Sequence, residues 1–185
     1  LMQPYEVSGT VHLAPALASR LGHKALGGEA RALTAIRIEN FARSVAYRKG
    51  KLRDALKVFG APLELDLESS LAFWGEVRRL SFFPANGAHL WRISTTPSRA
   101  AALVAAVRRH MRVETFYDWS GGLVWLETPA SADAASADIR RAVASHGGHA
   151  TLIRADETVR QSVDVFQPLG PAVDRITRGI KQAFD

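Results

Sequence analysis

Hydrophobic positions in the second half of the chain switch between the two-residue period of strands and the 3.6-residue period of helices. The strand-like segments are 89–95, 113–117, 123–127 and 150–154. The helix-like segments are 97–110 and 128–145. Pro97 and Pro129 follow threonines at the expected helix starts, and Gly147-Gly148 is typical of a helix end. The resulting order, β-α-β-β-α-β, predicts an α+β ferredoxin-like module, an antiparallel sheet with helices packed on one face.

The first half of the chain reads as a looser version of this module. Strands are expected at 6–13, 33–39 and 63–65, and helices at 14–21, 44–59 and around 71–80. The turn cluster 83–87 is the natural seam, so one domain over 1–185 would contain sub-modules 1–83 and 88–185 that share an extended sheet. A closing amphipathic helix is expected to point four apolar side chains inward, those of Val173, Ile176, Ile180 and Phe184.

The composition excludes several classes of protein and of metal site. The chain is 47% hydrophobic and 23% charged, which is ordinary for a globular domain, and no apolar run approaches the ~20 residues that span a bilayer. It contains no cysteine, which excludes disulfides, thiolate zinc sites and cysteine-ligated iron–sulfur clusters within these residues. The absence of disulfides in a chain of this size favours a cytoplasmic location.

The net charge of +6 arises from 24 basic and 18 acidic side chains, and most of the basic ones are arginines. They occur in pairs on the polar sides of expected helices, as at Arg78-Arg79 and Arg108-Arg109, which is typical of solvated helix faces. Nucleic acid, an anionic ligand or an acidic protein are the alternative partners for such a surface.

Histidines and glycines suggest neither a metal site nor a phosphate loop. His146 and His149 flank a glycine pair with no third ligand nearby, so a helix end is the better interpretation and no metal is expected. Gly27-Gly28 and Gly121-Gly122 lack the strand-loop-helix context and the G-x-G-x-x-G spacing of dinucleotide sites. No nucleotide-binding loop of the chain's own is predicted.

Arg92 is the strongest single candidate for function. It lies in the middle of an expected strand, where a cation must be paired or exposed on an open sheet face. It could stack on Trp91 or Trp125 as a structural residue, or bind a carboxylate bidentately on the sheet face. RNA-recognition modules share this strand order, but Gly121-Gly122-Leu123-Val124-Trp125 lacks their basic residue and paired aromatics.

A series of short sequence segments (phrases) along the whole chain resembles the carboxy-terminal domain of the FAD-binding subunit of glycolate oxidase. That subunit is one of the vanillyl-alcohol-oxidase-like flavoproteins. The phrases are Tyr5-Glu6-Val7-Ser8-Gly9, Arg37-Ile38-Glu39-Asn40-Phe41-Ala42-Arg43-Ser44-Val45, Leu90-Trp91-Arg92-Ile93-Ser94, Trp119-Ser120-Gly121-Gly122-Leu123-Val124-Trp125-Leu126, His146-Gly147-Gly148-His149-Ala150-Thr151-Leu152-Ile153-Arg154 and Val165-Phe166-Gln167-Pro168. Their specificity lies in the order of the series rather than in any one motif.

The resemblance implies a domain that lays its sheet over a flavin ring. FAD would be held mainly by an amino-terminal domain outside this sequence, and Phe184-Asp185 matches the start of the family's ending, so a fragment is expected. Arg92, Trp91, Trp119 and Trp125 are the residues expected on the flavin-facing sheet. The implied activity is FAD-dependent oxidation of glycolate or a similar small 2-hydroxy acid, with a non-catalytic assembly subunit as the alternative.

The resemblance also implies partners. Related 2-hydroxyacid dehydrogenases carry a histidine-rich Gly-Asp-Gly-Asn segment for substrate and metal, and nothing in this chain matches it. A sister flavoprotein subunit would then carry out the chemistry and an iron–sulfur subunit would accept the electrons. Such a complex would be cytoplasmic, peripheral at the inner face of the membrane, and would involve neither nucleic acid nor a membrane span.

Overall fold

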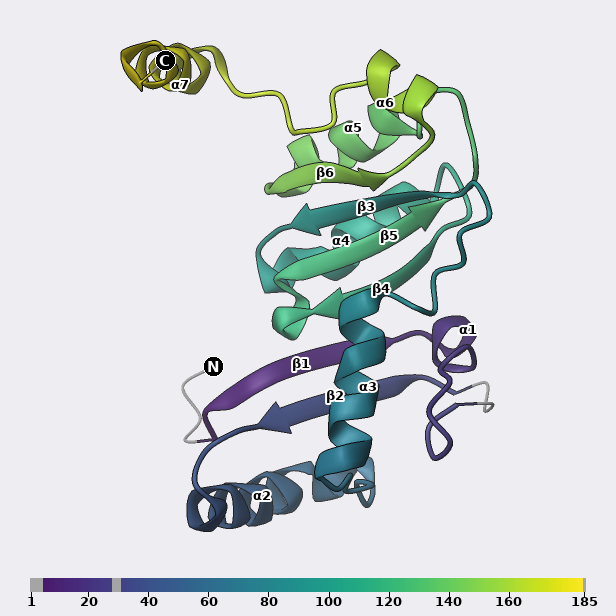
Figure 1. Ribbon diagram of the computed structural model, residues 1–185, viewed down its shortest axis with the longest axis vertical. Coiled ribbons are helices and arrows are strands. Elements are labelled where there is room, and N and C mark those ends of the chain that lie inside the picture. The colour runs from purple at the N-terminus through teal and green to yellow at the C-terminus, as the bar shows by residue number, and fades with distance from the viewer. Residues whose placement is uncertain (1–4, 28–30, 185) are drawn as a thin grey trace.

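A six-stranded antiparallel sheet forms the body of the protein in a computed structural model, which describes residues 5–27 and 31–184 (Figure 1). The strands are β1 (Val7–Leu13), β2 (Leu33–Ile38), β3 (His89–Ser94), β4 (Glu114–Asp118), β5 (Leu123–Thr128) and β6 (His149–Arg154). Their spatial order is β2-β1-β4-β5-β3-β6, and every neighbouring pair is antiparallel. The predicted α+β class with an antiparallel sheet is therefore confirmed.

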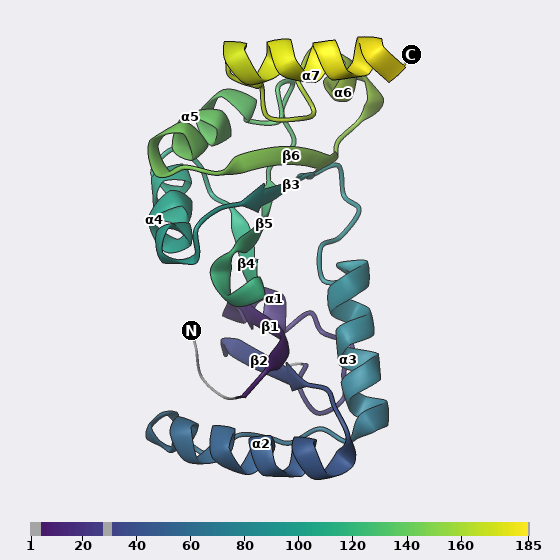
Figure 2. The ribbon, with the colours of Figure 1, turned by 90° about the vertical axis from the view of Figure 1, so that its left-hand side faces the viewer.

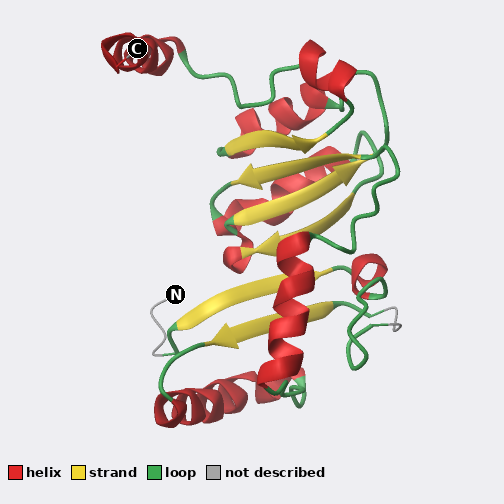
Figure 3. Cartoon of the chain, viewed as in Figure 1, coloured by secondary structure: helices red, strands yellow, loops and turns green. Residues whose placement is uncertain are grey.

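The helices surround this sheet and extend beyond both of its ends (Figure 3). The α-helices are α1 (Pro15–Ala18), α2 (Ala42–Leu56), α3 (Leu67–Arg79), α4 (Pro97–Arg108), α5 (Ser136–His146), α6 (Glu157–Ser162) and α7 (Pro171–Phe184). Two 3₁₀ turns are η1 (Lys57–Phe59) and η2 (Trp119–Gly121).

The second half of the chain forms the ferredoxin-like module. Its elements follow one another as β3-α4-β4-β5-α5-β6, and both α4 and α5 pack on the same face of the four strands. The core on that face is fully buried and includes Trp91, Ile93, Leu103, Leu126 and Ile139. Every second side chain along a strand points to the same face, and Trp91 and Ile93 of β3 and Val124 and Leu126 of β5 point to this one.

The first half of the chain contributes a β-hairpin to the same sheet. Strand β1 joins the edge of the module by pairing Val11 with Asp118 and Leu13 with Phe116. Helix α3 packs on the face opposite α4 and α5, where Phe73 and Phe116 are buried in a second core (Figure 2). The Asp66 carboxylate caps α3 by accepting a hydrogen bond from the Ser69 N–H at 2.8 Å.

Two expected elements differ from the structure. Residues 63–65 form no strand, although Leu65 packs against the second core. Helix α5 begins at Ser136 rather than near 128, because Ala134 and Ala135 adopt φ angles of 51° and 55° that interrupt a right-handed helix. A turn in which the Ala135 N–H donates to Asp133 Oδ1 occupies the intervening stretch.

Helix α7 forms as expected, but its apolar side does not point inward. Val173 is 54% exposed and Phe184 is 88% exposed. The cause is the segment before the helix, which Arg140 fixes along the edge of β6 through bonds to the carbonyl oxygens of Asp164 and Phe166. Helix α7 therefore starts beyond the last strand, with no sheet face beneath it (Figures 1 and 2).

Within residues 5–27 and 31–184, no helix combines the length and the apolar character that crossing a bilayer requires.

Candidate functional site

The candidate site lies on the face of β3, β4, β5 and β6 that is opposite helices α4 and α5. Strand register brings three side chains into one row there, since Arg92 pairs with Trp125 on one side and with Thr151 on the other. Directly paired residues in antiparallel strands project from the same face of a sheet. Arg92, Trp125 and Thr151 are all partly exposed, and Ile153 farther along β6 is 39% exposed. This part of the sheet is open to a ligand or a covering domain.

Trp125 has a fixed orientation on this face. Its ring stacks on Phe116 of the neighbouring strand with an interplanar angle of 11° and a centroid separation of 6.2 Å. Phe116 is fully buried and contacts the rings of Phe82 and Phe83. The indole of Trp125 therefore packs against the second core. Trp125 thus offers a rigid planar surface next to the Arg92 guanidinium.

Arg92 is the unbonded cation of this row. Among the described residues, no hydrogen bond or ion pair holds its guanidinium, which still interacts electrostatically with Asp118. Arg154, by contrast, is neutralised by Glu127 at 3.0 Å and also donates to the carbonyl oxygen of Phe83. Burial nevertheless raises the pKa of Glu127, and Arg154 opposes that rise. Arg92 is therefore the arginine of this face that remains available to an anion.

Asp118 is a carboxylate that interacts electrostatically with Arg92. Burial raises the pKa of Asp118 above its ordinary value, while the backbone N–H of Trp119 and the charge of Arg92 act in the opposite direction. The Trp119 N–H donates to Asp118 Oδ1 at 2.7 Å. This face of the sheet therefore combines a cation, an indole and a carboxyl group whose protonation responds to the cation.

We expect the Arg92→Ala substitution to raise the pKa of Asp118 further. Removing the cation eliminates one of the two influences that lower this pKa, and burial, the largest influence, remains. An NMR titration of the Asp118 carboxyl carbon in both proteins measures the shift directly. An unchanged or lowered pKa in the variant would contradict the placement of Arg92 beside Asp118.

Two of the four predicted site residues lie elsewhere. Trp91 points to the opposite face, is fully buried, and donates from Nε1 to the carbonyl oxygen of Ala134 at 2.9 Å. The Arg140 guanidinium lies over its ring at 5.2 Å. Trp119 occupies the η2 turn and is 64% exposed. The prediction that Trp91 shares a face with Arg92 is wrong, because consecutive residues of a strand point to opposite faces.

No pattern in the sequence points to three further residues of this site. Phe116 and Thr151 join the row only through the register of β4 and β6 against the central strands, and Asp118 follows two residues after Phe116 on the same face, opposite Leu123. Alternation within a strand can assign each residue to a face, but it cannot identify the neighbour across the ladder. The pairing of β4 with β5 around the 119–121 turn is the one signal that could have placed Phe116 beside Trp125.

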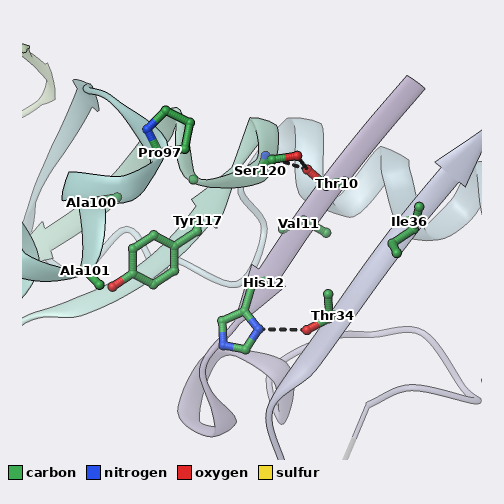
Figure 4. A pocket seen from close by; sticks show the side chains of 11 residues that line it. Thr10, Val11, His12, Thr34, Ile36, Pro97, Ala100, Ala101, Tyr117 and Ser120 are labelled. Atoms are coloured by element: carbon green, nitrogen blue, oxygen red, sulfur yellow. Dashed lines mark hydrogen bonds between the residues drawn. The ribbon is translucent and has the colours of Figure 1, made fainter. Parts of the chain in front are cut away.

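A separate cavity of about 400 Å³ lies on the other face, between α4 and the hairpin of β1 and β2 (Figure 4). Its polar groups are uncharged hydroxyls together with His12, whose Nδ1 lies 2.8 Å from Thr34 Oγ1. Burial raises the pKa of Tyr117, so its hydroxyl stays protonated at neutral pH. Among the described residues that line the cavity, none is a carboxylate, a lysine or an arginine.

In the part of the chain that the structure describes, no three His, Cys, Asp or Glu side chains gather as metal ligands would. His146 lies at the end of α5 with its Nδ1 2.9 Å from the carbonyl oxygen of Ala142, and His149 is exposed. Gly147 ends the helix with φ of 79°, as the glycine pair suggested.

Comparisons of the chain with protein-family profiles, with curated proteins and with solved structures found no match. The open sheet face and the residues that line it are therefore the features of the molecule that bear on its function.

Proposed function

We propose that the protein is the flavin-covering domain of an FAD-dependent oxidoreductase of the glycolate oxidase type, acting on glycolate or a similar small 2-hydroxy acid. The observation that carries this proposal is the unbonded guanidinium of Arg92 beside the rigid indole of Trp125 on an open sheet face. A ligand that fits this site is a planar ring on the indole with an anionic group at the guanidinium, or a small carboxylate at the guanidinium next to such a ring.

Each residue of the row has a distinct task under this proposal. Arg92 binds the anionic group, because its planar fork can donate two parallel hydrogen bonds to a carboxylate. Trp125 excludes water and limits the tilt of whatever lies on it, and Thr151 offers a hydroxyl on the far side of Arg92. FAD supplies the redox chemistry when bound, and its nucleotide part would be held by a separate domain.

The sequence resemblance and the fold support the same proposal from different directions. The resemblance places Arg92 and Trp125 in two of its phrases, and the strand register makes these two residues neighbours. A sister flavoprotein subunit and an iron–sulfur subunit belong to the proposal as partners. RNA binding loses support, because Trp91 lies in the core and β3 presents Arg92 rather than an aromatic ring to the open face.

The cofactor content of the natural polypeptide tests this proposal. We expect FAD in a ratio close to one per polypeptide, released by heat or acid and identified by chromatography. A preparation that is folded, complete and devoid of flavin, and that fails to take up added FAD, would reject the proposal.

A second candidate function is a non-catalytic assembly subunit of such a complex, and α7 favours it. Its apolar side chains are exposed although they line one side of the helix, as the surface of a subunit interface does before assembly. The polar side carries Arg175, Arg178 and Lys181. Ile176→Asp with Ile180→Asp should release a sister subunit under this alternative, while flavin reduction by substrate would be absent in the unmodified protein as well.

A further inference from the structure

Helix α2 is the most exposed regular element at the end of the molecule beyond β2. It lies across that end, away from α4, α5 and the open face of the ferredoxin-like module (Figures 1 and 2). None of its residues is buried, and only a stripe that includes Val45, Arg48, Leu52 and Leu56 is partly covered by the body. The remaining sides of the helix face solvent.

The exposed sides of α2 and the following turn are strongly cationic. Residues 42–59 contain six lysines and arginines and a single acidic residue, Asp54. Glu64 compensates Lys49 and Arg53 at 2.7 and 3.6 Å, and Asp54 compensates Lys57 at 2.8 Å. Arg48 pairs with Glu6 on the covered side.

Arg43 and Lys51 form no ion pair among the described residues. Lys51 interacts electrostatically with Asp54, and its Nζ lies 5.7 Å from the centroid of the Tyr47 ring. The outer side therefore keeps an excess of positive charge.

Large apolar side chains project at both ends of this cationic surface. Phe41 is 84% exposed directly before α2, and Val58 and Phe59 are 83% and 85% exposed directly after it. Tyr47 is 66% exposed between them. Although the apolar stripe of α2 itself faces the body of the protein, exposed Phe side chains beside a cationic surface can enter the boundary between headgroups and acyl chains.

We propose that α2 rests on an anionic phospholipid surface, with Arg43, Lys51 and Lys57 against the headgroups and Phe41 and Phe59 as apolar anchors. Charge complementarity favours this partner, since cations near an anionic leaflet are each attracted to it. A protein partner fits less well, because lysine is depleted from protein interfaces and the apolar residues here are separated by charges rather than contiguous. The proposal is independent of the flavin-covering function.

Vesicle flotation tests the proposal with phosphatidylcholine vesicles that do or do not contain phosphatidylglycerol. The protein should float with the anionic vesicles alone, and 0.5 M salt should weaken this binding because exposed charges are screened. Arg43→Glu with Lys51→Glu should reduce the fraction bound at least ~10-fold, since two attractions become repulsions. Phe59→Ser should weaken vesicle binding less than the double charge variant does. Its loss of binding should be the same at low and at high salt.

Matched variants away from α2 serve as controls. Arg109→Glu with Arg112→Glu changes the net charge by the same amount on exposed residues after α4, and Phe166→Ser removes an aromatic residue that is 72% exposed. These variants should bind anionic vesicles as the unmodified protein does. The proposal would be overturned if both charge variants lost vesicle binding equally, or if the unmodified protein did not float with anionic vesicles. Retention of the protein by polyglutamate or RNA without flotation would overturn it as well. Circular dichroism confirms that every variant is folded.

Discussion

Gly148→Ala is expected to lower the free energy of unfolding by about 3–5 kcal/mol, the largest loss that we expect from a single methyl group. A Cβ at this position would overlap the carbonyl oxygen of Ser94 and lie 3.1 Å from the Thr95 Cβ. The φ angle of Gly148 is 120°, which side-chain-bearing residues rarely adopt. The steric overlap and the unfavourable φ angle both occur where β6 begins to pair with β3, next to the pair of Ser94 and His149.

Gly50→Ala is the matched control for this substitution. Gly50 lies inside α2, and a Cβ there would meet nothing within 4 Å. Alanine should therefore stabilise the protein by about 0.5–1 kcal/mol through its better helix propensity. Urea unfolding of both variants measures the two effects with opposite signs. A Gly148→Ala loss below about 1 kcal/mol would show that β6 does not start as close to Ser94 as described.

Arg92→Ala should have the largest effect on function, lowering the rate constant for flavin reduction by substrate at low substrate concentration by about 100-fold. Loss of a bidentate, charge-assisted interaction with a carboxylate accounts for a change of this size. The stability of the domain should change by less than about 0.5 kcal/mol, because no hydrogen bond or ion pair holds Arg92 among the described residues. Anaerobic stopped-flow measurements on the flavin-containing polypeptide separate the two quantities.

Arg92→Lys and Arg109→Ala complete this experiment. Lysine keeps the charge but not the planar fork, so it should recover only part of the rate. Arg109 is exposed at the end of α4, and its removal should leave the rate unchanged. A normal rate in Arg92→Ala, or an equal loss in Arg109→Ala, would remove Arg92 from the site.

The fold of the second half of the chain was predictable because its signals are local. The short apolar runs of β3 and β5, proline in the first turn of α4 and glycine after α5 each act within a few residues. The start of α5 was missed because the strained turn at Ala134 and Ala135 has no compositional signature. Alanines are good helix formers, so the sequence favoured a helix there and tertiary packing prevented it.

The candidate site was only half predictable for a related reason. Arg92 stands out because a cation in the middle of a strand requires an explanation, and Trp125 because the resemblance implies that it lies with Arg92 on the flavin-facing sheet. Trp91 was wrongly grouped with them, since neighbours in sequence are not neighbours on a sheet face. Asp118 and Thr151 depend on cross-strand register, which the chain's periodicity does not encode.

Helix α7 illustrates the limit of amphipathicity as evidence. Its pattern correctly indicates a helix with one apolar side, and it favours burial of that side in the domain's own core. The apolar side is exposed because the bonds that Arg140 makes to residues 164–167 direct the chain past the last strand. Periodicity identifies which residues seek burial, but not the surface that buries them.

The most direct test of the central claim is the visible absorption spectrum of the natural flavin-containing polypeptide before and after anaerobic addition of glycolate. The flavin-covering function predicts that the oxidised flavin bands bleach, and that Arg92→Ala slows the bleaching. Flavin bands that persist with glycolate and with other small 2-hydroxy acids would contradict it and leave assembly as the function of the domain.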